Sequence, residues 1–385
     1  MLIYRFFPNG SKNINSLWPM RPLEHLDLCL RPIIICHDQE PLDFDRYKYD
    51  TNEVTELRKK KFSPMLDKVL PDLNLATESW ANFYHKRILI HSEKNSDQVD
   101  RYRDTDLFEP CFYWSHAIIA RDWYRYAEFD PLLRSEKTPK KIFNIYCRAW
   151  SGSRRYRIDF LNLLAHSAVV DHCRVKFSEF NDDVHYSTQT TLPLHKIFEP
   201  NQTQSTSSAE YDAGDYLQTH IDLVLETLAD DRVHLTEKIL RPIACKQPFM
   251  ILSGPGSLEF LKSYGFLTYS DYIDESYDKE KDSTKRMKLL IDSMKEVCKI
   301  TDWRPLYEIA EYNSRWFFSN EFYNMIISEL KNNLDDAAKK AFFLKSQLWL
   351  PDGVKGAMHN DDTVEIDEIR EKFNKKKLSV NRALI

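Results

Sequence analysis

Short runs of apolar, mostly β-branched or aromatic residues recur in the first third of the chain, and polar residues follow each run at once. The runs are residues 32–36 (PIIIC), 87–90 (RILI) and 111–114 (CFYW). A run of this length with polar or turn residues at its ends is typical of a strand buried on both faces. Because longer helical stretches separate the runs, they predict a parallel sheet with helical crossovers.

A charged segment that contains a proline, residues 135–141 (SEKTPKK), interrupts this pattern and predicts a linker. A second series then begins with a strand at 142–146, a loop at 147–153 and a helix with one apolar stripe between 158 and 164. Further strands are expected at 174–177, 220–225 and 248–252, a mobile loop at 196–214, and helices from 285 to about 346. The chain therefore contains a second α/β unit followed by helices.

These patterns predict an α/β protein with two domains, each built on a parallel sheet. We place the first domain at residues 1–138 and the second at residues 139–300. C-terminal helices and a tail are expected at residues 301–385. A chain of 385 residues, 42% of them apolar, supplies enough material for two hydrophobic cores.

Charge and cysteine content narrow the class of protein. Basic residues (54) and acidic residues (59) nearly balance, for a formal net charge of -5, which argues against a protein that coats nucleic acid by bulk electrostatics. The seven cysteines are scattered without a CxxC pair, which indicates reduced thiols and no structural zinc. No stretch offers the ~20 apolar residues of a membrane span, and the start lacks a signal peptide. We expect a soluble, cytoplasmic protein without a membrane partner.

Segment 234–252 carries the most informative pattern. Thr236 is a favourable N-cap, and the apolar face of the following helix leaves Glu237, Lys238 and Arg241 at its exposed start. Free N–H groups and the helix dipole attract anions there, so the two cations would complete a phosphate site, and the carboxylate suits a ribose diol. The structural alternative is an i,i+4 pair of Glu237 with Arg241 beside a solvated Lys238, and it stays open.

Two glycine-containing loops are expected at the carboxyl edge of the same sheet. Gly254 follows strand 248–252 and permits close backbone approach by a ligand. The loop after strand 142–146 leads into an arginine-rich helix and would present N–H groups and cations to an anion. The residues of this second loop that we expect to bind the ligand are Arg148, Ser151, Gly152, Arg154 and Arg157. The motifs GxGxxG and GxxxxGK[ST] are absent, which disfavours dinucleotide oxidoreductases and P-loop proteins.

Together these segments resemble the donor domain of GT-B glycosyltransferases, in particular the α-1,3-fucosyltransferase type. The resemblance is carried by a strand ending in Leu225-Glu-Thr, then Thr236-Glu-Lys, an Arg-Pro helix and Pro248-Phe-Met, and it covers residues 140 to 280. It implies a nucleotide-sugar donor and a GT-B fold, in which two Rossmann-like domains face a cleft. It also implies that the C-terminal segment 301–385 packs back on both domains, with the helix at 303–318 crossing to the first. By resemblance, Glu237 and Lys238 contact the ribose and diphosphate, and Arg148 clamps the phosphates.

Transfer of a sugar to a hydroxyl with inversion needs a base, which we expect from the first domain, across the cleft. Asp38 and Glu40 follow strand 32–36, and we place Asp38 first. The reserve candidates at similar strand ends are His37, His91, Glu93 and His116. Arginine and lysine clamps can neutralise a diphosphate unaided, so we expect neither a metal ion nor a cofactor besides the donor substrate. The acidic run at 271–278 is expected to be solvated and without a catalytic role.

The Thr-Glu-Lys segment, with the later Ser-Tyr-Gly-Phe and Ile-Asp-Glu-Ser-Tyr-Asp stretches, also resembles bacteriophage-encoded glycosyltransferases that modify DNA. This resemblance implies 5-hydroxymethylcytosine in DNA as the acceptor and the host cytoplasm as the location, with a basic and aromatic groove for a flipped base. Segments 58–61, 114–126 and 375–377 could contribute to such a groove. Two alternatives stay open: a glycan-modifying, fucosyltransferase-like enzyme, and a non-catalytic phage protein that binds a nucleotide or a partner. The sequence does not indicate an oligomeric state.

Overall fold

Two parallel sheets organise the computed structural model, which describes residues 2–5, 33–45, 86–105, 108–178, 180–181, 184–185, 199–200 and 209–341. The first sheet has the order β1 (Leu2–Arg5), β2 (Ile33–Cys36), β3 (Arg87–His91), β4 (Phe108–Phe112). The second has the order β11 (Phe249–Leu252), β10 (Thr219–Leu225), β5 (Lys141–Cys147), β6 (Cys173–Phe177), β9 (Glu199–Pro200). All pairings within both sheets are parallel, which confirms the predicted α/β class. A small antiparallel pair, β7 (Phe180–Asn181) and β8 (Val184–His185), stands apart.

The predicted strands are present, with one shift, and four strands of the structure were not predicted. The run expected at 111–114 begins earlier as β4, so Tyr113 and Trp114 follow the strand as buried core residues. Sequence reasoning missed β1, β7, β8 and β9. The last three have only two residues each, too few for a readable period. The basic segments 58–61 and 375–377 lie outside the described residues.

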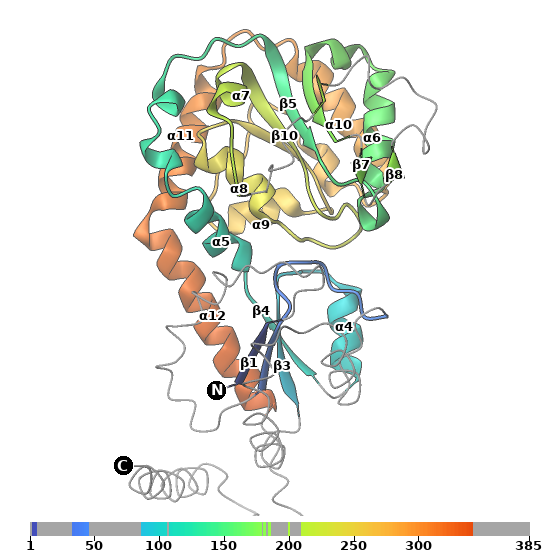
Figure 1. The fold of residues 1–385 in the computed structure, drawn as a ribbon, viewed down its shortest axis with the longest axis vertical. Coiled ribbons are helices and arrows are strands. Elements are labelled where there is room, and N and C mark those ends of the chain that lie inside the picture. Colours follow the sequence, from blue (N-terminus) through green and yellow to red (C-terminus); the bar gives the residue numbers. More distant parts are fainter. Residues whose placement is uncertain are drawn as a thin grey trace, which may run out of the picture.

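Helices connect the strands and cover the sheets (Figure 1). They are α4 (Asp97–Asp104), α5 (Ser115–Trp123), α6 (Tyr156–Ala165), α7 (Ala213–Leu217), α8 (Glu237–Ala244), α9 (Ser257–Ser263), α10 (Ser283–Val297), α11 (Arg304–Phe318) and α12 (Asn320–Ala341). Helical structure predicted from 285 onward is confirmed as far as Ala341. The expected crossing helix differs, because α11 packs against α8, whereas α12 runs down to β3 and β4 of the first sheet.

The two faces of the second sheet differ in polarity. Phe143, Ile145 and Cys147 of β5 point to one face and are fully buried in the hydrophobic core. The alternate residues Asn144 and Tyr146 point to the other face, where they neighbour two basic residues of β6, Arg174 and Lys176. One hydrophobic cluster nevertheless joins residues of both sheets, such as Ile34, Phe143 and Leu223, with Leu330 of α12. A second cluster, which includes Leu89 and Tyr102, packs the other face of the first sheet against α4.

Candidate functional site at the junction of the two sheets

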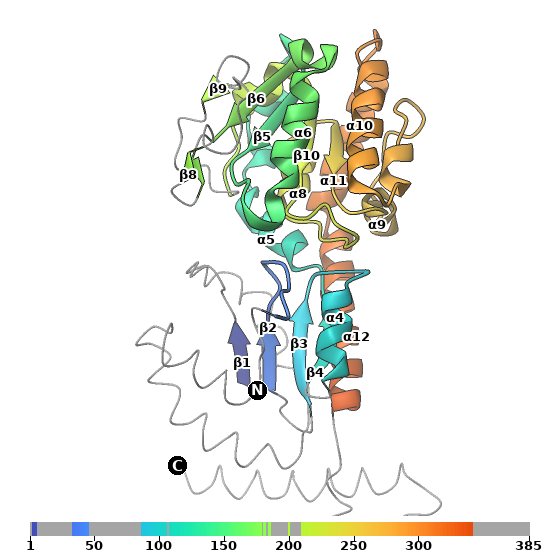
Figure 2. The ribbon, with the colours of Figure 1, turned by 90° about the vertical axis from the view of Figure 1, so that its right-hand side faces the viewer.

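The strands of the first sheet direct their carboxyl ends toward the second sheet (Figure 2), so the loops that follow β2, β3 and β4 meet the second half of the chain. The Asp38 carbonyl oxygen, after β2, accepts hydrogen bonds from the hydroxyls of Ser92 (2.9 Å) and Ser115 (2.6 Å). Ser92 Oγ also lies 3.2 Å from Nδ1 of His234, which precedes α8. The carboxyl edge of the first sheet is therefore tied directly to the start of α8.

The N-terminus of α8 is capped by a carboxylate that sequence reasoning missed. Glu226 follows β10 directly and is fully buried. Its carboxylate accepts hydrogen bonds from the N–H groups of Thr227 (3.0 Å), Thr236 (3.1 Å) and Ile239 (3.3 Å), and from Thr236 Oγ1 (2.6 Å). Thr236 is the N-cap, as predicted, and its hydroxyl oxygen also accepts from Lys238 N at 3.4 Å. The chain's own anion thus occupies the position expected for a phosphate.

Glu237 and Lys238 lie together at this helix start, but Glu237 is buried and not exposed as predicted. Lys238 Nζ donates to Glu237 Oε1 (2.7 Å) and to the hydroxyls of Thr227 and Thr236 (both 3.2 Å). The other Glu237 oxygen lies 3.1 Å from Nδ1 of His116 on α5. Burial alone would raise the pKa of Glu237, but Lys238 and His116 outweigh it and hold the pKa well below its usual value. Glu237 is therefore an ionised carboxylate shared by both halves of the chain.

Arg241 takes neither of the two positions considered from the sequence. It makes no ion pair with Glu237 among the described residues, and it does not join Lys238. Its guanidinium lies over the ring of Tyr146, 4.2 Å from the ring centroid, on the polar face of the second sheet. This position is one helical turn below the expected phosphate site, between α8 and β5.

Arg157 is buried with only 3% of its surface exposed, and its guanidinium is occupied by the backbone. It donates to the carbonyl oxygens of Ala149 (2.6 Å), Leu225 (2.9 Å) and Glu226 (2.5 Å). These bonds fasten the loop after β5 to the end of β10. Arg157 therefore holds the two loops side by side, and its donors do not face a ligand.

The rest of the loop after β5 lies at the surface. Gly152 has a φ of 58° and open space on its Cβ side, as expected for a loop that a ligand can approach. Ser151 precedes the short 3-10 helix Gly152–Arg154, and Arg148 is exposed. Arg154 Nη2 reaches Glu40 Oε2 of the first half at 3.0 Å. The structure thus brings one predicted base candidate against the predicted donor loop.

Packing against the chain's own backbone requires a glycine at position 254. A Cβ at this position would lie 1.9 Å from the Arg232 carbonyl oxygen, so the close approach is made by the protein backbone.

The next helix, α9, is also capped internally, because Asp278 Oδ2 accepts from Leu258 N at 3.1 Å. Burial raises the pKa of Asp278 to about 6. The prediction that the run 271–278 is solvated was therefore wrong for Asp278, which is a buried helix cap.

The reserve candidates for the base are buried. Burial lowers the pKa values of His37 and His91 to about 3, so both are neutral near pH 7. Glu93 accepts from Leu42 N (2.6 Å) and Ser96 Oγ (2.5 Å), which fixes it as a structural carboxylate. Asp38 is 5% exposed, whereas the Glu40 side chain is 31% exposed. Glu40 is the more accessible of the two base candidates.

His116 and His234 place further polar atoms at the junction. Their rings meet edge to face with centroids 5.3 Å apart. The Nε2 atoms of both side chains are buried and have no hydrogen-bond partner among the described residues. These two atoms are the kind of unsatisfied polar group that a water or a ligand commonly completes.

The described part of the chain contains no group of three or more His, Cys, Asp or Glu side chains arranged to hold a metal ion. None of its helices is long and apolar enough to cross a membrane.

Within the aromatic segment 114–126, Trp114 and Tyr124 are core residues and Tyr126 is 66% exposed. Comparisons of the chain with protein-family models and with curated proteins give no match.

Chemically, the junction combines accessible cations with a carboxylate from the opposite half. Arg148, Arg154 and Lys238 can neutralise an anion with several oxygens, and Glu40 can accept a proton. Arg157 ties the loop after β5, which carries Arg148 and Arg154, to Glu226, whose side chain caps the helix of Lys238. The arrangement suits the binding and displacement of a phosphorylated leaving group.

Proposed function

We propose that this chain is a GT-B-type glycosyltransferase that binds the diphosphate of a nucleotide-sugar between the loop after β5 and the start of α8. The observation that carries the proposal is that Arg157 donates both to Ala149 O, in the loop after β5, and to Glu226 O, whose side chain caps α8. We also propose that the chain forms two separate domains, with boundaries near residue 138 and residue 300. The C-terminal helices would link them.

Diphosphate binding would use side chains more than the helix dipole, because Glu226 already caps α8. Two of the three Lys238 contacts are neutral threonine hydroxyls. Charge-assisted bonds to phosphate oxygens are roughly twice as strong as neutral ones, so a diphosphate would replace these hydroxyls. Glu237 would remain the partner of Lys238 and accept from a ribose hydroxyl.

For the chemical step, we propose that Glu40 is the base ahead of Asp38, because its side chain is accessible. The cations would stabilise the leaving diphosphate without a metal ion. A base that takes the proton of the acceptor hydroxyl fits a displacement with inversion. The proposed acceptor is 5-hydroxymethylcytosine in DNA, which rests on the sequence resemblance alone.

The non-catalytic alternative has one observation in its favour. The chain's own carboxylates, Glu226 and Asp278, fill the helix N-termini of α8 and α9, so the edge is stable without a ligand. A protein that keeps the shape but not the activity would bind a nucleotide and leave its nucleotide-sugar intact.

Thermal unfolding with UDP, GDP, CMP and ADP tests the donor site. A nucleotide at about one hundred times its dissociation constant stabilises the folded chain by ~2.7 kcal/mol. We expect one nucleotide to do so, and we expect the shift to disappear in Lys238→Ala. The control is Lys262→Ala, which removes an exposed lysine on α9. A shift with no nucleotide, or an equal shift in Lys238→Ala, contradicts the proposed site.

A further inference from the structure

The contact between Glu40 and Arg154 differs from every other carboxylate contact described at the junction. Among the described residues, the Glu40 carboxylate has no hydrogen-bond or ion-pair partner other than Arg154, and the Arg154 guanidinium has none other than Glu40. The buried carboxylates Glu226 and Glu93, in contrast, each accept from two or more groups. Glu40 is thus held by a single oxygen–nitrogen contact.

Accessibility makes this contact weak. The Glu40 and Arg154 side chains are 31% and 25% exposed, so water screens the pair and competes for it. One Nη2–Oε2 distance of 3.0 Å also uses only one edge of the guanidinium. A phosphate group can bind a guanidinium through two parallel bonds and carries more charge than a carboxylate. A phosphate that reaches Arg154 would therefore displace Glu40.

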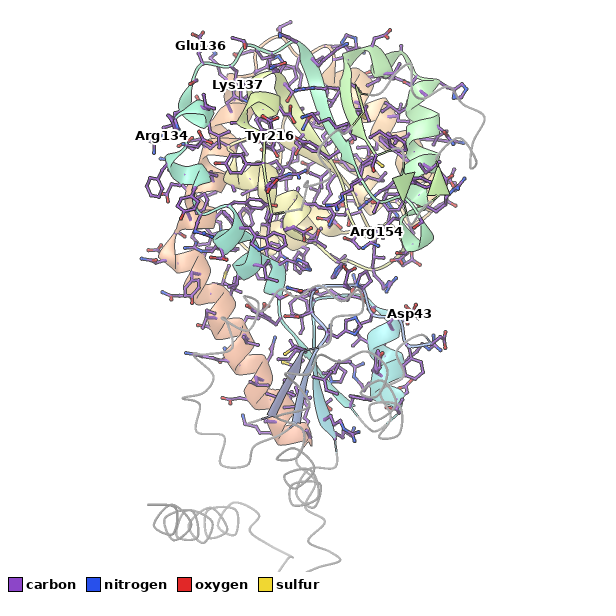
Figure 3. The ribbon with its side chains drawn as sticks, viewed as in Figure 1. Asp43, Arg134, Glu136, Lys137, Arg154 and Tyr216 are labelled. Atoms are coloured by element: carbon purple, nitrogen blue, oxygen red, sulfur yellow. The ribbon has the colours of Figure 1, made fainter. Side chains whose placement is uncertain are left out.

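The position of the Glu40–Arg154 pair determines where the Glu40 carboxylate would be after its displacement. Arg154 lies at the border of the second-sheet half that faces the first sheet, and the loop of Glu40 comes from the opposite side (Figure 3). Glu40 has no alternative side-chain partner among the described residues. Once released, it would be a free carboxylate at the surface of the junction.

We propose that Glu40 is an internal counter-ion of Arg154 which the donor diphosphate displaces, so that donor binding releases Glu40 to act on the acceptor. This inference rests on the proposed function. In the transfer step, the acceptor hydroxyl gives its proton to Glu40 while its oxygen bonds to the sugar carbon. The bond from that carbon to the phosphate oxygen breaks, and its electron pair leaves with the nucleoside diphosphate. Donor would then bind before acceptor.

The test is the affinity of Glu40→Gln for anions. Calorimetry would measure the dissociation constant for the nucleoside diphosphate that stabilises the wild type, and for inorganic pyrophosphate as a second probe. Removing a weak internal competitor raises the competent fraction, so we expect Glu40→Gln to bind both about two- to five-fold more tightly. Glu40→Asp, with a shorter side chain, should change the affinity in the same direction and serves if Glu40→Gln does not fold.

Two controls distinguish displacement of Glu40 by the anion from a general effect of removing one negative charge. Asp43→Asn makes the same charge change at an exposed position of the same loop, and it should leave the affinity unchanged. In an Arg154→Gln background, Glu40→Gln should have no further effect, because the competing pair is already gone. Equal gains in Asp43→Asn and Glu40→Gln, or a gain that persists without Arg154, would overturn the inference.

The outcomes also separate this inference from the proposed function. If the wild type binds a nucleotide through Lys238 but Glu40→Gln binds no more tightly, the counter-ion role is wrong and the donor site stands. If no nucleotide binds but pyrophosphate binds more tightly to Glu40→Gln, the anion site and its counter-ion stand and the proposed function fails. If neither probe binds, both are wrong.

Discussion

Polar side chains at the junction separate into two groups by the number of partners that they hold. Arg157 and Glu226 are buried and bonded to several backbone groups, and they fix the loops in place. Glu40 and Arg154 are partly exposed and bonded once. Residues of the second group can exchange a protein partner for a ligand at little cost, which is why we propose that Arg154 exchanges Glu40 for a phosphate.

Buried neutral histidines predict how stability depends on pH. The pKa of His91 is about 3 in the folded chain because of burial, below its value of about 6.5 in the unfolded chain. As the pH falls below 6.5, the unfolded chain therefore takes up a proton that the folded chain does not. The stabilising contribution is full above pH 6.5 and is lost progressively between pH 6.5 and 3.

We expect His91→Gln to lose less stability on acidification than the wild type does. Each proton contributes about 1.4 kcal/mol per pH unit, so the loss between pH 6.5 and 5 should be smaller by about 2 kcal/mol. Urea denaturation at both pH values measures this difference. His166→Gln, at an exposed position, should show the wild-type loss. An equal loss in His91→Gln and wild type would show that His91 is protonated in both states or in neither.

At the scale of elements, the helices α8 and α9 begin at the carboxyl edge of the second sheet, and both are capped by carboxylates of the chain. Glu226 caps α8 from the end of β10, and Asp278 caps α9 from the short 3-10 helix Ser276–Lys279, 20 residues after Leu258. Such caps satisfy N–H groups that a helix start leaves free. The helix starts are thus stable before any anion arrives.

The cap of α8 can be tested by Glu226→Gln. The amide keeps one acceptor oxygen but places an NH2 group against N–H donors, so the variant should lose bonds to a charged acceptor. We expect the free energy of unfolding to fall by about 1–3 kcal/mol in urea denaturation. Glu210→Gln, at an exposed position, should change it by less than about 0.5 kcal/mol. If the free energy of unfolding is the same in Glu226→Gln and wild type, the carboxylate charge does not stabilise the α8 start.

For the whole molecule, the structure joins the two sheets in one hydrophobic core. The helix α12 leaves α11 near Ser319 and packs on β3 and β4, and Arg121 of α5 donates to the carbonyl oxygens of Phe318 (3.1 Å) and Ser319 (2.8 Å) at this bend. The helix α12 therefore covers the first sheet and is tied through α11 and α5 to the second half. Unfolding one half would expose core residues of the other.

This shared core predicts a single unfolding transition. Leu334 of α12 is fully buried, and Leu334→Ala should lower the free energy of unfolding by about 2–5 kcal/mol. For each of the two proteins, tryptophan fluorescence and far-UV circular dichroism should give one and the same midpoint, and this midpoint should be lower in the variant than in the wild type. The control Asp335→Ala changes an exposed neighbour on the same helix and should leave the midpoint nearly unchanged. Separate midpoints for the two probes would show that the two sheets unfold independently.

Much of the fold was predictable because it is local. The strands at 32–36, 142–146 and 220–225 follow from apolar runs, since a buried parallel strand excludes polar residues from both faces. The N-cap at Thr236 follows from the residue itself, since a hydroxyl there accepts from the helix start. The loop at Gly152 is likewise recognisable from its own composition.

The sequence by itself determined the α/β class, the parallel strands and the helix starts, because each depends on residues within one or two turns of chain. Only the tertiary structure decided which charged side chains serve the fold and which face the junction. Arg157 finds its carbonyl partner 69 positions away, and Arg154 finds Glu40 at a separation of 114. Charge has no periodicity that reveals such distant partners, so the roles of Arg157, Arg241 and Glu226 emerged only once the sheets had brought them together.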